Sequence, residues 1–83
     1  MRFKAEIDVM PNENLLDPQG KAVSSNMKNL GLAEIDHVRI GKHISLEIEA
    51  ENEESAREKV DQACKSILAN MIMESYHFEL ERV

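Results

Sequence analysis

The strongest constraint on the fold is a change in hydrophobic period along the chain. Near the N-terminus charged side chains alternate with apolar ones, which are Phe3, Ala5, Ile7 and Val9. The same alternation returns near the C-terminus with Tyr76, Phe78 and Leu80. A period of two with one polar face is typical of a half-buried strand. Between these segments the period lengthens to that of helices, so the chain predicts an α+β fold.

The first helix is expected from Pro18 to about Leu30. Asp17 can cap it by accepting a hydrogen bond from a free backbone N–H, and Pro18 lacks the donor that the first helical position does not need. Its apolar stripe comprises Ala22, Val23, Met27 and Leu30. Gly31 follows where a left-handed residue commonly ends a helix.

The second helix is expected to begin after Asn52, which can cap it, with Glu53 and Glu54 in the first turn. Carboxylates there favour the positive end of the helix dipole. The apolar positions have helical spacing and are Ala56, Val60, Ala63, Cys64, Ile67 and Leu68. Asn70 is expected as a left-handed terminator.

Residues 34–50 are interpreted as two strands joined by a tight hairpin at Gly41 and Lys42. A two-residue turn would put Ile44 on the wrong face, whereas a three-residue loop from Gly41 to His43 pairs Ile40 with Ile44. The alternative is a single long strand bent at Gly41. His37 and His77 are expected on the open sheet face as exposed residues.

The expected order is therefore β-α-β-β-α-β in one domain, residues 1–83. This is the order of a ferredoxin-like sandwich, a four-stranded antiparallel sheet with two helices on one face. Its first and last strands are neighbours. Their pairing would bring three oppositely charged pairs together: Arg2 with Glu81, Lys4 with Glu79, and Glu6 with His77.

Composition excludes several functions. The 83 residues carry 16 acidic against 10 basic side chains, a net charge of −6, which disfavours nucleic-acid binding. No apolar run approaches the roughly 20 residues of a membrane span. The start of the chain lacks the apolar segment of a secretory signal, so we expect a cytoplasmic protein. A chain this small without disulfides or metals is also expected to be oligomeric.

No catalytic, cofactor-binding or metal-binding residues are predicted. Cys64 has no second thiol and falls in the apolar stripe of the second helix, where it is expected as a small buried hydrophobe. The three histidines show no ligand spacing. Two features remain without a structural role. Gly20 inside the first helical turn weakens the helix, which suggests a close approach to its backbone. Arg39 and Lys42 are cations near the predicted hairpin tip, suited to an anionic partner.

These stretches also carry a resemblance. Leu16-Asp17-Pro18-Gln19-Gly20, Val38-Arg39-Ile40-Gly41-Lys42, and Leu68-Ala69-Asn70 followed by Glu74 and Tyr76 resemble the PurS family over essentially the whole chain. PurS is the small subunit of multi-subunit phosphoribosylformylglycinamidine (FGAM) synthase. The segment Met71-Ile72-Met73 departs from that pattern.

The resemblance implies a non-catalytic subunit in the fourth step of purine biosynthesis. The complex uses ATP and Mg to convert formylglycinamide ribonucleotide and glutamine to FGAM. This subunit would bridge a glutaminase and a large synthetase subunit as a homodimer or tetramer, support ammonia transfer, and bind no cofactor itself. The expected interface residues are Leu16, Asp17, Pro18, Gln19, Gly20, Arg39, Gly41, Lys42 and Asn70.

The alternative is an ACT-like regulatory module that binds a small molecule and has the same element order. Such modules commonly bind an amino acid beside a glycine-bearing turn after the first strand. Residues 10–16 contain no glycine, which counts against this alternative.

Overall fold

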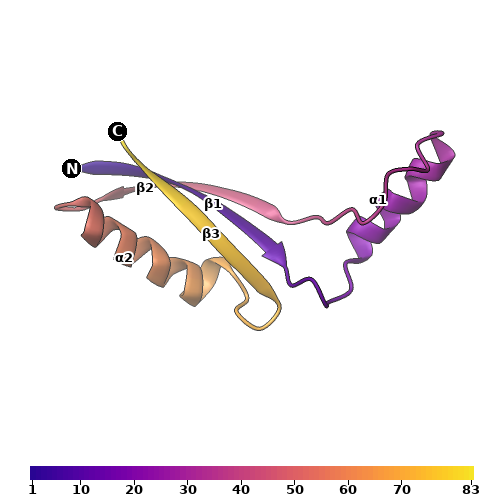
Figure 1. Cartoon of the computed structure of the whole chain (residues 1–83). Helices are drawn as coiled ribbons and strands as arrows, with labels where there is room; N and C mark the ends of the chain where they lie inside the picture. The colour runs from indigo at the N-terminus through magenta and orange to yellow at the C-terminus, as the bar shows by residue number, and fades with distance from the viewer.

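Three strands form one antiparallel sheet in the order β2-β1-β3, and two helices complete the chain. The computed structural model describes all 83 residues (Figure 1). The strands are β1 (Arg2–Pro11), β2 (Lys42–Glu49) and β3 (Glu74–Arg82). The helices are α1 (Pro18–Asn29) and α2 (Glu53–Ala63), and α2 continues into a π-helical turn, η1 (Cys64–Leu68). No helix has the length and apolar character needed to cross a membrane.

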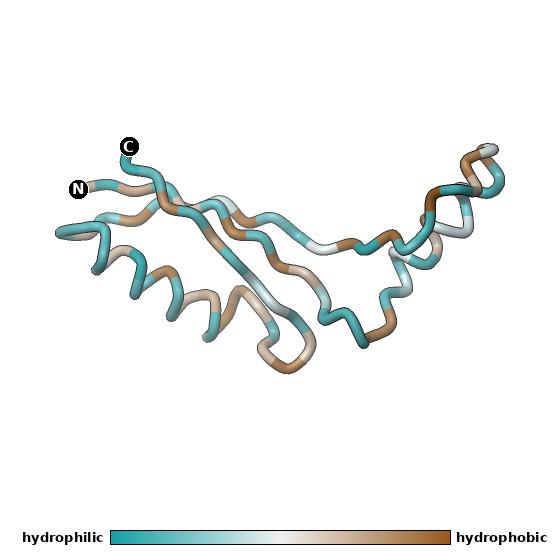
Figure 2. Tube along the Cα trace, in the orientation of Figure 1, coloured by the Kyte–Doolittle hydropathy of each residue, from teal (hydrophilic) through white to brown (hydrophobic).

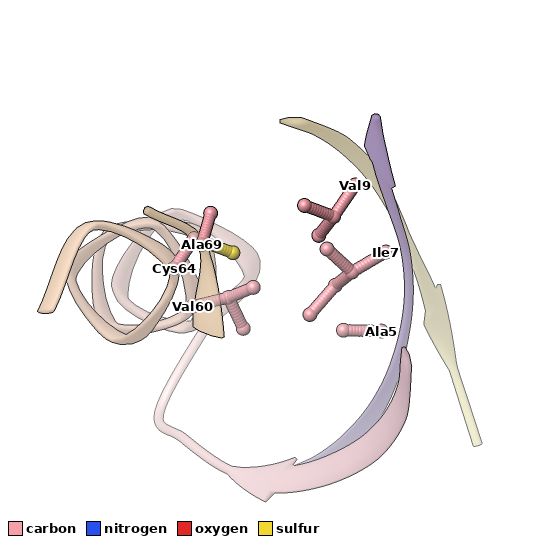
Figure 3. Packing of buried hydrophobic residues seen from close by; sticks show 6 residues of the cluster. All are labelled: Ala5, Ile7, Val9, Val60, Cys64 and Ala69. Atoms are coloured by element: carbon pink, nitrogen blue, oxygen red, sulfur yellow. The ribbon is translucent and has the colours of Figure 1, made fainter. Parts of the chain in front are cut away.

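The core lies between β1 and α2. Strand β1 is paired on both sides, and α2 with the residues that follow it packs over its apolar face, so that face is buried, as the alternation predicted. In Figure 3 side chains of β1 point toward those of α2 and the residues that follow it. The members of this cluster are Ala5, Ile7, Val9, Val60, Cys64 and Ala69.

The second helix begins as predicted, since the Asn52 side chain accepts a hydrogen bond of 2.8 Å from the Ser55 N–H. Its end differs. The Ala69 N–H donates to the Cys64 carbonyl at 2.9 Å, which closes a wider π-helical turn. The extra residue in that turn changes the helical phase, so Ile67 is 81% exposed while Ala69 is buried. The prediction that Ile67 lies in the apolar stripe is therefore wrong.

Helix α1 also has the predicted caps. Its C-terminus is a Schellman motif, in which Gly31 (φ +77°) donates to Lys28 at 3.2 Å and Leu32 donates to Met27 at 2.8 Å. However, α1 does not cover the sheet. Together with its two connections it forms an arm, residues 12–41, which projects from one end of the sheet (Figure 1).

The predicted four-stranded ferredoxin-like arrangement is thus wrong in two respects, because the sheet has three strands and only α2 covers it. Residues 36–41 belong to no strand, so there is no hairpin at Gly41. Their backbone is bound elsewhere: the Val38 N–H donates to Ser24 Oγ and the Ile40 N–H donates to Asp17 Oδ2. The alternative of one continuous strand is nearer, but the strand begins only at Lys42.

The pairing of β1 with β3 is correct but its predicted register is shifted by two residues. The observed partners are Lys4 with Glu81, Glu6 with Glu79 and Asp8 with His77. An even shift keeps every side chain on its predicted face, which is why the alternation could not reveal it. Arg2 instead forms an ion pair with Glu47 of β2 at 2.7 Å.

Two further predictions fail locally. Asn70 is not left-handed, since His37 is the only non-glycine residue with a positive φ. Helix α2 ends without such a terminator because η1 is followed directly by Ala69 in an extended conformation. His37 lies in the connection before β2 and not on a strand.

Candidate functional site

The two connections of the arm meet beside the sheet at a junction, which comprises residues 12–20 and 38–42. A Cβ atom at Gly20 would overlap the carbonyl oxygen of Val38, and one at Gly41 would overlap that of Val9. The expectation that a close approach explains the glycine in the first turn of α1 is confirmed. Both glycines are therefore required by the contact between neighbouring chain segments.

Asp17 ties the junction together. One carboxylate oxygen accepts from the Gly20 N–H at 3.0 Å and the other accepts from the Ile40 N–H at 2.8 Å. The side chain is only 9% exposed. These backbone donors, first Gly20 and then Ile40, lower the pKa of Asp17 below its ordinary value. One carboxylate thus caps α1 and also fixes the returning connection.

Arg39 lies on the connection that returns from α1 and reaches back to the loop after β1. Its guanidinium donates to the carbonyl oxygens of Asn12 at 2.7 Å and Pro11 at 3.2 Å, and more weakly to those of Glu13 and Leu15, both at 3.4 Å. The planar fork of donors suits several acceptors at once. Arg39 was predicted as a free cation at a hairpin tip. It instead shapes the loop after β1, and Lys42 is the exposed cation nearby.

The turn between η1 and β3, residues 70–73, is fastened to the same loop. Asn70 Oδ1 accepts from the Ile72 N–H at 3.0 Å, so the side chain shapes the turn. Asn12 donates its backbone N–H to Met73 at 2.9 Å and its side-chain amide to Ile72 at 3.2 Å. Leu16 and Asn70 line one shallow hollow. The structure therefore brings the predicted interface residues to one end of the sheet.

Several exposed apolar side chains at this end of the molecule were missed by sequence reasoning. We refer to them together as the end patch, and they are Leu16, Ile67, Met71, Ile72 and Met73. Ile72 is 86% exposed and Leu16 is 79% exposed. In Figure 2 the turn before β3 is apolar although it lies at the periphery. The sequence did contain a signal for this exposure. Three consecutive apolar residues follow Asn70 directly, in a segment too short to form another strand.

The chemistry of the remaining groups is structural. Burial raises the pKa of the Cys64 thiol, which makes it a poor nucleophile. The Tyr76 hydroxyl donates to Asp61 on α2, and this bond raises the pKa of Tyr76 to about 12. No three histidine, cysteine or acidic side chains converge as metal ligands.

Comparison with known proteins places the chain in a family. The family model of PurS, described as phosphoribosylformylglycinamidine (FGAM) synthase, matches residues 4–82. The subunit PurS of that synthase from Synechocystis is 40% identical over 78 residues, which cover 94% of this chain and 78% of the relative. The corresponding subunit from Thermotoga maritima is 39% identical over 74 residues, covering 89% and 90% of the two chains.

Solved structures agree. A Bacillus subtilis PurS structure superposes with a TM-score of 0.86 at 35% identity, covering 96% of this chain and 99% of that one. A chain in the structure of PurLQS from Thermotoga maritima gives a TM-score of 0.89 at 36% identity, covering 98% and 99%. The chain described above therefore belongs to the PurS family and is a subunit of FGAM synthase, an enzyme of purine biosynthesis.

Proposed function

We propose that this chain is the non-catalytic assembly subunit that bridges the glutaminase and the large synthetase of FGAM synthase. The observation that carries the proposal is the incomplete packing of the arm and the end patch. The radius of gyration is 16.5 Å, whereas a compact chain of this length has roughly 12 Å. Only 10 of 83 residues are buried, so most of the surface is free for other subunits.

The reaction requires ammonia to pass from one protein to another, which explains the need for a bridging subunit. The complex converts formylglycinamide ribonucleotide, ATP and glutamine to FGAM, ADP, phosphate and glutamate. The synthetase phosphorylates the amide oxygen, and ammonia freed by the glutaminase displaces the phosphate. Ammonia that escapes into water is protonated and loses its nucleophilic lone pair. A subunit that holds the two active proteins together therefore supports transfer, while ATP and Mg act on the synthetase.

A second copy of the chain is the proposed partner for the apolar side of the arm. Leu30 is 71% exposed and the rest of the apolar stripe of α1 is at most half-buried. Two-fold dimers are the commonest oligomers, and a small chain gains most from sharing a core. Leu30→Asp should lower the mass measured by light scattering toward that of a monomer. Ser25→Asp adds the same charge to an exposed position on the other side of α1 and should leave the mass unchanged.

Reconstitution tests the main proposal. The glutaminase and synthetase from one source are assayed with and without this chain, once with glutamine and once with ammonium. We expect the chain to be required with glutamine and dispensable with ammonium. Full glutamine-dependent turnover in its absence would contradict the proposal.

The ACT-like alternative is not favoured. Its ligand site would lie beside the loop after β1, and the carbonyl groups of that loop are occupied by Arg39. The family matches also point to the synthase subunit.

A further inference from the structure

The open face of the sheet, opposite α2, holds a histidine between two carboxylates. Nδ1 of His43 lies 2.6 Å from Asp8 Oδ1, and Nε2 lies 2.5 Å from Glu6 Oε2. His43 belongs to β2 and both acidic residues belong to β1, with Asp8 its direct partner in the ladder. The sequence pattern predicts His43 in a hairpin loop, so it gave no indication of this cluster.

The two short contacts favour the charged form of the ring. A neutral imidazole has one N–H, so one of the two short contacts would join a nitrogen lone pair to a carboxylate. Both contacts are favourable only when both nitrogens carry a proton. The two acidic partners, first Asp8 and then Glu6, correspondingly raise the pKa of His43.

Other charged groups surround the cluster on all three strands. On β1, Lys4 Nζ lies 3.3 Å from Glu6. On β2, Ser45 Oγ donates to Glu6 at 3.0 Å, and Lys42 and Glu47 lie on the same strand. On β3, His77 Nδ1 lies 3.8 Å from Asp8 and Glu79 is the ladder partner of Glu6. Without a charge on His43, Asp8 would lose its closest cation and Glu6 would face Glu79 with Lys4 alone.

The position of the cluster matters because β2 is an edge strand. It is held only by β1, and His43 is its second residue. The preceding residues, 38–41, form the connection that returns from α1 through the junction. The cluster therefore fastens the point at which the arm enters the sheet.

We propose that His43, Glu6 and Asp8 form a proton-operated clamp, which holds the start of β2 on β1 when the ring is charged and releases it when the ring loses a proton. The clamp is a property of the chain by itself and does not depend on its role as a subunit. Release would loosen one of the two connections of the arm, and hence the surface offered for assembly.

The direction of the pH effect follows from the raised pKa of His43. The clamp is fully formed below the ordinary histidine pKa of about 6.5 and is lost as the pH rises through the higher value of the folded chain. Loosening is thus expected on the alkaline side of the ordinary value.

Nuclear magnetic resonance on the full chain tests the clamp. The ring nitrogens report the protonation of His43, and hydrogen exchange reports opening of the backbone. The protection of the amides of residues 42–45 is divided by that of residues 78–80 in the same sample, which cancels the intrinsic pH dependence of exchange. We expect this ratio to fall several-fold over the pH range in which His43 loses its proton.

Three variants sharpen the test. His43→Gln should give a low ratio at every pH, whereas His77→Gln, on the same face, should behave like the parent chain. Asp8→Asn removes one acidic partner and should move the midpoint to lower pH. A His43 that titrates at or below the ordinary value, or a ratio that stays constant through its titration, would overturn the proposal.

Discussion

The two ends of this molecule are built by different interactions. In the sheet half, comprising the strands and α2, apolar side chains of β1 are enclosed by those of α2. In the arm the only buried residue of α1 is Gly20, and the fixed points are polar contacts of Asp17 and Arg39. The sheet half can therefore fold on its own core, whereas the arm is positioned by tethers and keeps its apolar side free.

The difference indicates that the sheet half is stable by itself, whereas α1 lacks a packing partner within the chain. A helix of 12 residues is marginal in water without an apolar surface to pack against. The caps of α1 define its ends but supply little stability. The arm should gain its full stability only against a second protein surface, which is what a subunit of a complex provides.

The largest contrast is expected from truncating matched apolar side chains in the two regions. Ile7→Ala removes a fully buried side chain and should lower the free energy of unfolding by about 2–5 kcal/mol. Met27→Ala, in the stripe of α1, should lower it by less than about 1 kcal/mol in the monomer. Urea denaturation at low protein concentration measures both. Equal losses would mean that α1 shares the core.

The next effect is expected at the close approach in the junction. Gly20→Ala forces a methyl group against the Val38 carbonyl and should cost about 1–3 kcal/mol. Gly31→Asn is the control, because that position is open and asparagine tolerates its positive φ. Thermal unfolding and protease cleavage within residues 18–35 are the readouts. If Gly20→Ala left both thermal stability and protease cleavage unchanged, the two connections would not pack as described.

Comparing Arg39 with Lys42 distinguishes the effect of losing the Arg39 hydrogen bonds from the effect of losing a surface charge. Arg39→Gln removes the donors that hold the carbonyl groups of residues 11–15, so this loop should become sensitive to protease in the isolated chain. Lys42→Gln removes an exposed cation nearby and should leave the loop protected. If both variants bind the partner subunits as the parent does, neither cation belongs to an interface.

The smallest effect is the response of the arm to acid. The pKa of Asp17 is lowered, so its contribution is present above the ordinary aspartate value and is lost as the pH falls through the value of the folded chain. Amide exchange in α1 should therefore accelerate in acid before exchange in β1 does. Asp17→Asn should remove this response, whereas Asp36→Asn, at an exposed position, should retain it. Simultaneous loss of α1 and β1 would contradict independent tethering.

Most of the local structure follows from the sequence. The alternation around Ile7 and the caps Asp17 and Asn52 set the strand faces and the starts of both helices, and they were predicted correctly. These features depend on neighbouring residues only. The glycine at position 20 also indicated a close approach correctly, although not which segment makes it.

The failures with the largest effect on the fold are non-local. Val38 and Ile40 have the pattern of a strand, but their amides bind Ser24 and Asp17, so no fourth strand forms. The register of β3 depends on which even shift packs best against α2, and every even shift has the same hydrophobic pattern. The role of Arg39 depends on carbonyl groups 24–28 residues away, which leave no trace in composition. Whether the junction binds a partner remains a prediction.

We expect the arm to be completed by another protein, and hydrogen exchange tests this most directly. Hydrogen exchange of α1 and β1 should be compared in the dilute chain, in the concentrated chain, and in the presence of the glutaminase and synthetase. We expect β1 to be protected in all three samples, and α1 to be protected only at high concentration or in the complex. Protection of α1 equal to that of β1 in a dilute monomer, unchanged by partners, would contradict this expectation.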